Sequence, residues 1–155
     1  MPPPPPADGR AIPRPALLLG ASGAVPFVVF SLALLVAPPE FRAWLRQALL
    51  AYAMVILAFV GALHWGFTIK TEGFTEAERW TWMGWSVVPA LAAWAAAMVP
   101  YRLGITLMLM TFGVHLALDH AFAARSGLPA WYLRLRRGLT AAVVVSLVVA
   151  LAAPR

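Results

Sequence analysis

The chain alternates long apolar runs with short polar segments. Each long run approaches the roughly 20 apolar residues that a helix needs to cross about 30 Å of hydrocarbon. The runs cover residues 16–37, 47–69, 80–99, 103–124 and, more briefly, 138–153. This pattern predicts an all-α fold, an integral membrane bundle of five transmembrane helices within residues 16–155.

The first fifteen residues differ from the rest. Five consecutive prolines follow Met1 and favour an extended polyproline conformation, so residues 1–15 are expected to form a disordered, Pro-rich N-terminal tail. The apolar run that follows has 22 residues, which is longer than the 7–15 of a signal-peptide core. We therefore interpret it as an uncleaved first span.

Several residues indicate where the helices begin. Pro39 is typical of a first helical turn and places the start of the second helix well before its apolar run, and Pro129 does the same for the fifth. Thr75 and Glu78 have the spacing of a capping box before the third helix. Four tryptophans near the predicted span ends are typical of an aromatic belt at the membrane interface: Trp44, Trp80, Trp82 and Trp131.

Two prolines lie inside predicted spans. Pro26 and Pro89 cannot donate the backbone hydrogen bonds that would satisfy the carbonyls of Ser22 and Trp85. A freed carbonyl in lipid needs another partner, so both prolines are expected to face protein.

Only 12% of the residues are charged and 62% are hydrophobic, too few charges to cover a water-facing surface. The net charge of +6 is spread over loops, which favours topology signals over a nucleic-acid surface. With five spans, four basic residues fall on one side: Arg42, Arg46, Arg102 and Arg155. Eight fall on the other: Arg10, Arg14, Lys70, Arg79, Arg125, Arg134, Arg136 and Arg137. The bias predicts a cytoplasmic N-terminus.

Four ionisable side chains fall within predicted spans, where they are costly and need partners. They are His64, His115, Asp119 and His120. His115 and Asp119 are four residues apart and share a helix face, whereas His120 points about 100° away from Asp119. His64 lies at a similar depth on the second helix, which runs in the same direction as the fourth.

The segment GALHWG, residues 61–66, surrounds His64 with small and bulky residues. Gly61, His64 and Thr68 share one helix face. We expect Gly61 to remove bulk so that a neighbouring helix comes close, Gly66 to do the same on another face, and Trp65 to fill the space between them.

An arginine at the start of the fifth helix can reach the buried acid. We expect Asp119 to form an ion pair with Arg134 or Arg137, linking the fourth helix to the fifth. The alternative is a ligand or proton site built from the same groups.

Motifs for catalysis and cofactors are absent from the sequence. It contains no cysteine, no H-E-x-x-H, no G-x-S-x-G and no glycine-rich phosphate loop. We therefore expect no enzyme activity, no metal and no cofactor. A b-type haem between His64 and His120 remains a rival, because two axial histidines would suffice for it.

Four segments resemble one known family. They are GASGAVPF at 20–27, AYAMVILAFVGALHWG at 51–66, VVPALAAW at 87–94 and LPAWYLRLRRGLT at 128–140, together with Asp119. The chain is similar to the domain of unknown function 3429 family, the transmembrane protein 69-like integral membrane proteins. The resemblance implies a small multi-span protein of a bacterial or mitochondrial membrane and transfers no mechanism, and we expect a bacterial inner (cytoplasmic) membrane. The matching residues are Gly61, His64, Trp65, Gly66, Asp119, Trp131, Tyr132, Arg134 and Arg136.

These observations favour a structural, assembly or small-ligand-binding component of a membrane. Its expected partners are the lipid bilayer and a membrane protein or small hydrophobic ligand, with no nucleic acid. We expect Asp119 and Arg134 to pair beneath the rings of Trp131 and Tyr132, with His64 facing them. The alternative is a ligand carrier or a haem- or metal-binding protein analogous to the tryptophan-rich sensory proteins, which also have five spans.

Overall fold

The protein is a bundle of five α-helices. The computed structural model describes residues 11–154. The helices are α1 (Arg14–Val36), α2 (Pro39–Lys70), α3 (Glu76–Ala97), α4 (Tyr101–Ser126) and α5 (Ala130–Ala152). No strand occurs in this range, so the predicted all-α class is confirmed. The predicted tail of residues 1–15 lies mostly outside the described residues, and α1 begins at Arg14.

Four of the five helices are long and apolar enough to cross a membrane. α1, α2, α4 and α5 meet that description, with mean hydropathies between 1.4 and 2.2 over their most apolar stretches. α3 falls short because even its uncharged stretch from Trp80 onward contains four tryptophans and Pro89, together with threonine, glycine and serine, all of low hydropathy. The structure thus confirms a helical bundle with four candidate spans among the residues it describes.

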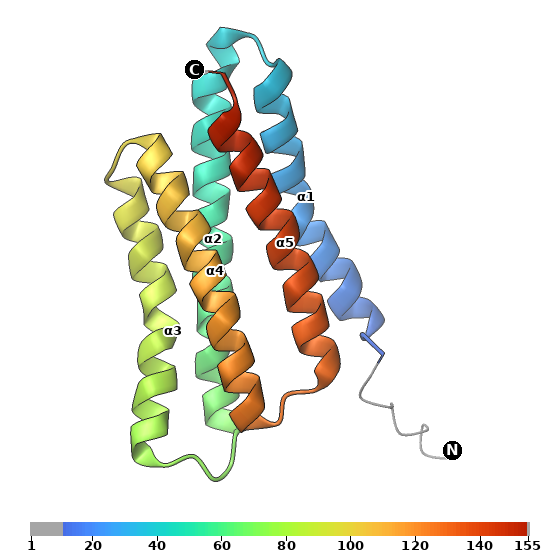
Figure 1. Cartoon of the computed structure of the whole chain (residues 1–155), viewed down its shortest axis with the longest axis vertical. Coiled ribbons are helices and arrows are strands. Elements are labelled where there is room, and N and C mark those ends of the chain that lie inside the picture. Colours follow the sequence, from blue (N-terminus) through green and yellow to red (C-terminus); the bar gives the residue numbers. More distant parts are fainter. Residues whose placement is uncertain (1–10, 155) are drawn as a thin grey trace.

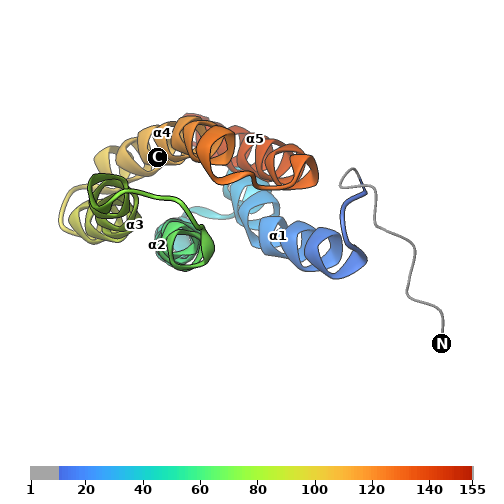
Figure 2. The same cartoon turned by 90° about the horizontal axis from the view of Figure 1, so that it is seen from below.

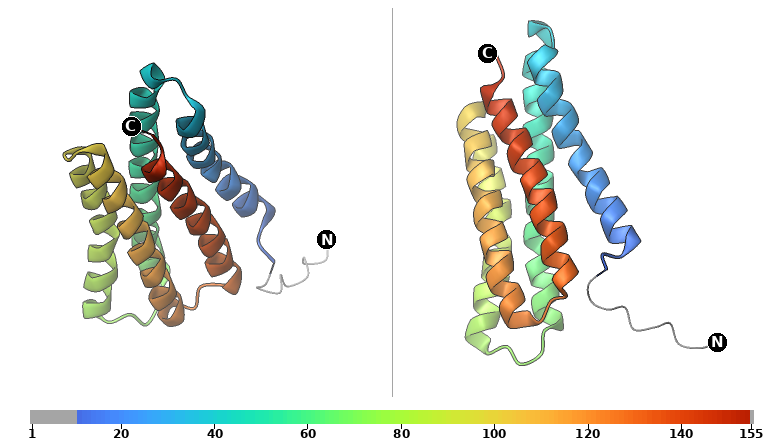
Figure 3. Two further views of the ribbon diagram at one scale, coloured as in Figure 1. Left: turned by 45° about the horizontal axis from the view of Figure 1, so that its top comes forward. Right: turned by 45° about the vertical axis from the view of Figure 1, so that its right-hand side comes forward.

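Successive helices run antiparallel, so that α1, α3 and α5 point one way and α2 and α4 the other (Figure 1). Seen from one end, α1, α2 and α3 form a row that α4 and α5 cover (Figure 2). α1 and α2 are joined by a short turn and diverge towards the N-terminal end of α1 (Figure 3). The core lies between the two layers, where Phe27, Leu57 and Phe112 are fully or almost fully buried.

The helix ends follow the predicted signals. Thr75 and Glu78 form the reciprocal capping box at the start of α3, as predicted. α2 begins at Pro39 and continues unbroken for 32 residues. α5 also begins early, but at Ala130: Pro129 is its N-cap rather than a residue of its first turn.

The two internal prolines differ in how deeply they are buried. Pro89 is buried against α2, as predicted, whereas Pro26 is only partly buried. Close to Pro26, the Tyr52 hydroxyl donates a hydrogen bond of 2.8 Å to the carbonyl of Gly23. A side chain of α2 therefore supplies a donor beside the interruption in α1.

Gly61 lies at a close contact between α2 and α3. A Cβ atom on Gly61 would lie 2.9 Å from the ring of Pro89 and 3.0 Å from the backbone oxygen of Ser86. Only a residue without a side chain fits there, which confirms the role predicted for this glycine.

The other two residues of the GALHWG segment do not have their predicted roles. A Cβ on Gly66 would meet nothing within 4 Å, so this glycine makes no close contact. Trp65 does not fill an interhelical space, since 47% of its surface is exposed. Trp65 and Gly66 follow His64 on the helix and turn away from the core because only His64 shares the face of Gly61.

We expect Gly61→Leu to destabilise the bundle by about 1–3 kcal/mol, because overpacking forces α2 and α3 apart. The matched control is Gly66→Leu, the same change five residues along the helix into open space. The measurement is the free energy of unfolding in mixed micelles with sodium dodecyl sulfate. Equal stabilities for the two variants would contradict the close contact at Gly61.

Candidate functional site

Asp119 is the centre of a buried polar cluster. It lies on α4 with 1% of its surface exposed, and its two carboxylate oxygens have different partners. Nε of Arg136 donates to Oδ2 at 2.6 Å, while Nε2 of His64 lies 3.0 Å from Oδ1. Tyr132 adds a longer hydrogen bond of 3.4 Å from its hydroxyl to Oδ1. We call His64, His115, Asp119, Tyr132 and Arg136 the Asp119 network.

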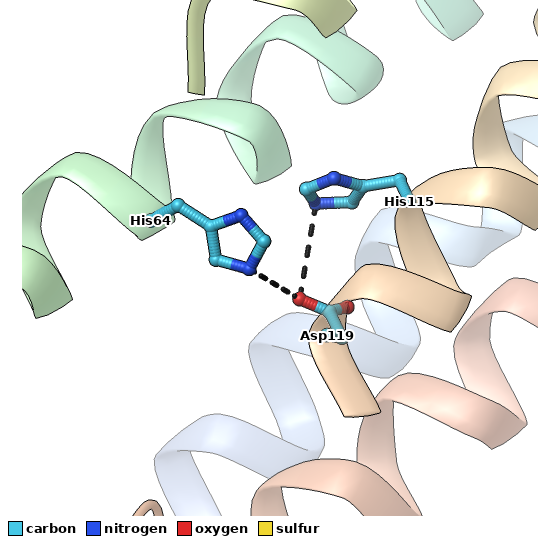
Figure 4. A group of neighbouring side chains, drawn as sticks. All are labelled: His64, His115 and Asp119. Atoms are coloured by element: carbon cyan, nitrogen blue, oxygen red, sulfur yellow. Dashed lines mark ion pairs between the residues drawn. The ribbon is translucent and has the colours of Figure 1, made fainter. Parts of the chain in front are cut away.

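The network joins three helices. His64 comes from α2, His115 and Asp119 from α4, and Tyr132 and Arg136 from α5. Figure 4 shows the two imidazoles pointing toward the Asp119 carboxylate, that of His64 from α2 and that of His115 from the same helix as Asp119. A carboxylate in an apolar interior is tolerated when charge and hydrogen bonds compensate it, and Asp119 receives both from its own chain.

The partner of Asp119 is Arg136, so the predicted pairing with Arg134 or Arg137 is wrong. Arg134 and Arg137 are exposed, whereas 6% of Arg136 is exposed. The reason is helical periodicity. Arg136 follows Tyr132 by four residues and shares its face, whereas Arg134 is two residues from either and points to the opposite side.

The other predicted site residues separate into two groups. Gly61, His64, Asp119, Tyr132 and Arg136 are buried. Trp65, Gly66 and Arg134 are exposed, and Trp131 is half-buried with its ring 6.3 Å from that of Tyr132.

His115 belongs to the network through two further contacts. Its Nε2 lies 3.9 Å from Oδ1 of Asp119, the four-residue neighbour with which it was predicted to share a face. The same nitrogen lies 3.2 Å from the carbonyl oxygen of Val60 on α2.

Trp85 on α3 determines the tautomer of His115. The indole nitrogen of Trp85 donates a hydrogen bond of 3.0 Å to Nδ1 of His115. An indole N–H can only donate, so Nδ1 must be the unprotonated nitrogen and Nε2 carries the hydrogen. His115 is therefore a neutral imidazole that donates towards the Val60 carbonyl and Asp119.

Aromatic rings enclose His64. Its ring stacks on Phe122 with centroids 4.9 Å apart, and Trp82 approaches edge-on at 5.8 Å. Trp82, predicted as a member of the interfacial belt, lies instead against this site, whereas Trp44 and Trp80 are largely exposed. Nδ1 of His64 has no hydrogen-bond partner among the described residues.

His120 is not part of this cluster. Its Nδ1 lies 2.8 Å from the carbonyl oxygen of Leu116 in its own helix, the position of a donor within α4. A haem held between His64 and His120 finds no support in this arrangement, because His64 instead faces Asp119.

The cluster has the composition of a metal site but not its hydrogen bonding. One ligand atom from each of His64, His115 and Asp119 lies within 4.8 Å of the others. Ligation by Nε2 of His115 would need the hydrogen on Nδ1, where it would face the Trp85 donor. Arg136 already places a positive charge on Asp119. The residues therefore fit a metal-free network better than a cation site.

Sequence reasoning missed the contributions of Trp85, Trp82 and Phe122. Trp85 is four residues before Pro89, and from that spacing we predicted only that its backbone carbonyl would lack a hydrogen bond. No local signal pairs an indole on the third helix with an imidazole on the fourth.

Comparison with known proteins gives a family. The family model described as "Protein of unknown function (DUF3429)" matches residues 12–152. The chain is 35% identical to Transmembrane protein 69 of Xenopus tropicalis over 136 residues, which is 88% of this chain and 53% of that protein. It is 30% identical to Transmembrane protein 69 of Mus musculus over 139 residues, or 90% of this chain and 56% of the relative.

The chain thus spans about half the length of these relatives. No solved structure matches. Together with the four apolar helices, these similarities confirm the predicted family and the prediction of a helical membrane protein. The chain belongs to the DUF3429 family and has relatives named Transmembrane protein 69.

Proposed function

We propose that the protein is a non-catalytic structural or assembly component of a membrane, in which the Asp119 network fixes α2, α4 and α5 relative to one another. The observation that supports this most is the complete use of the Asp119 carboxylate by side chains of the same chain. His64, His115 and Asp119 each expose 1% or less of their surface, which leaves no open face for a reacting substrate.

A structural role also agrees with the charge balance. Arg136 neutralises Asp119, and the Trp85 hydrogen bond keeps His115 uncharged. A buried network in which the charges of Asp119 and Arg136 balance each other is suited to holding helices together. A carrier or proton pathway would need polar groups continuing from the network to the other membrane face. Beyond Thr111 and Phe112, α4 continues through Met108 and Ile105, which are buried and apolar.

We further propose that all five helices cross the bilayer. α2 and α4 run in the same direction and pack against each other, so the chain between them must return from one end of the bundle to the other. α3 is the helix that makes this return, packed against both neighbours. Its modest hydropathy is consistent with a span that is shielded from lipid on two sides.

We also propose that the protein lies in a bacterial inner membrane with its N-terminus in the cytoplasm, an orientation that the basic residues support. Lys70, Arg79 and Arg125 lie at the end of the bundle where α1 and α5 begin. Fewer basic residues lie at the opposite end, as the positive-inside rule requires.

The proposed topology predicts the sides of two loops. Because the chain has no cysteine, Glu72→Cys and Val99→Cys each introduce a single thiol, one at either end of α3. In cells with a permeabilised outer envelope and an intact inner membrane, an impermeant maleimide should label the Val99→Cys protein. The Glu72→Cys protein should react only after lysis. Labelling of both, or of neither, would contradict a membrane-spanning α3.

The proposed structural role predicts the energetics of the Asp119–Arg136 pair. Removing one partner leaves the other charged and buried, so Asp119→Asn and Arg136→Gln should each destabilise by about 3–5 kcal/mol. The double variant should lose less than the sum of the two, because the charges are in direct contact. The control Arg134→Gln, two residues away and exposed, should be close to wild type.

The measurement for all four variants is the free energy of unfolding in mixed micelles with sodium dodecyl sulfate. Wild-type stability of Asp119→Asn would overturn the structural role, and so would additive effects in the double variant. A loss in Arg134→Gln as large as that in Arg136→Gln would contradict the assignment of the ion pair.

A further inference from the structure

A half-open cleft lies between α1 and α5, with α2 and α4 behind it. Its volume is about 140 Å³, close to the roughly 150 Å³ of an engineered apolar cavity that accepts benzene. The lining is apolar and includes Phe27, Ile56, Phe112 and Val143. Leu19 and Phe59, at its margin, expose 73% and 63% of their surfaces, so the cleft faces the surroundings of the bundle.

Two features of the helices create this space. α1 diverges from α2 towards its N-terminal end (Figure 3). Gly20, Gly23 and Ala24 face the cleft from α1, and a Cβ on Gly23 would meet nothing within 4 Å. There is therefore open space at Gly23 for an apolar group.

One polar group of the cleft lacks a partner. Arg136 lines the cleft and is 6% exposed, and its Nη2 makes no hydrogen bond within residues 11–154. The Nε of the same guanidinium is occupied by Asp119. A buried donor without an acceptor is costly, and Nη2 can be satisfied by an oxygen atom that enters the cleft.

The charge balance of Arg136 and its depth in the membrane indicate which kind of oxygen atom suits this donor. Because Asp119 already neutralises Arg136, an uncharged acceptor satisfies Nη2 without adding a second negative charge to the apolar interior. Arg136 follows the first residue of α5 by six positions, about 9 Å along the helix axis. The polar interface of one leaflet is about 5–8 Å thick. Arg136 thus lies near the boundary between head groups and hydrocarbon, which is the level of the ester carbonyls of a phospholipid.

We propose that this cleft binds one diacyl phospholipid. Part of one acyl chain occupies the apolar space beside Gly23, and the ester carbonyl of that chain accepts a hydrogen bond from Nη2 of Arg136. The head group remains at the membrane surface and contributes little selectivity. This site goes beyond the structural role proposed above and does not depend on which side of the membrane the N-terminus occupies.

Native mass spectrometry of the full chain in dodecyl maltoside can test the site with two matched lipids. Dipalmitoyl phosphatidylcholine carries ester carbonyls, and di-O-hexadecyl phosphatidylcholine has ether links in their place. In titrations, we expect one bound molecule of the ester lipid and about tenfold weaker binding of the ether lipid, which lacks the acceptor for the charged donor. Dipalmitoyl phosphatidylglycerol should bind about as well as dipalmitoyl phosphatidylcholine.

A matched pair of variants tests the location. Gly23→Leu fills the cleft and should abolish most of the binding of the ester lipid while the protein remains folded, since the new side chain enters open space. Gly113→Leu makes the same change at an exposed position of α4 where nothing lies within 4 Å, and it should bind as the wild type does. Neither change touches the Asp119 network, so a failure of this site leaves the structural role intact.

Four results would overturn the proposal. They are equal affinity for the ester and ether lipids, unchanged binding by Gly23→Leu, equal losses in Gly23→Leu and Gly113→Leu, and tighter binding of palmitate than of the diacyl lipid. Tighter binding of palmitate would indicate that the partner of Nη2 is a carboxylate and not an ester carbonyl.

Discussion

A carboxylate buried in an apolar interior must be supplied with compensating partners, and the arrangement of three helices in this protein depends on that requirement. Asp119 is almost completely buried, and transfer of an unpaired charge into such a site is strongly unfavourable. Arg136 approaches it from α5 and His64 from α2. The positions of α2 and α5 around α4 are therefore coupled, because displacing either helix would leave Asp119 without one of its partners.

Close packing and hydrogen bonding support each other at the centre of the bundle. Gly61 allows the backbone of Ser86 and the ring of Pro89 to approach α2 directly. Trp85 is the neighbour of Ser86, and its indole reaches His115 across the interface between α3 and α4. The close packing that Gly61 allows thus holds α3 where Trp85 can reach His115 and determine its tautomer. Gly61 therefore affects the network through the position of α3 as well as through its place on α2.

Sequence reasoning predicted the elements well because their determinants are local. Apolar run length located the five helices, and the capping box at Thr75 and Glu78 located the start of α3. The contacts of the site were harder to predict. The four-residue spacing correctly placed His115 beside Asp119, and burial of an ionisable group correctly indicated that a basic partner exists on α5.

The choice among Arg134, Arg136 and Arg137 depends on the rotation of α5, which is determined by packing against α1 and α4 rather than by the local sequence. Tyr132, Arg136, Thr140 and Val143 form one buried stripe at helical spacing, and that stripe is the signal that distinguishes Arg136. Trp85 carried no comparable signal. Its partner is thirty residues away, and aromatic residues near the ends of membrane helices are common in belts.

The neutral state of His115 has a consequence for the whole network. If Nδ1 of His115 were free, the imidazole could take a proton and share the charge of Asp119 with Arg136. Trp85 prevents this by occupying the nitrogen that would have to be protonated. Asp119 is then balanced by Arg136 through Nε, while Nη2 of the same guanidinium is buried without a hydrogen-bond partner among the described residues. A single arginine thereby contacts a carboxylate that fixes its position and also contributes to the lining of an apolar cleft.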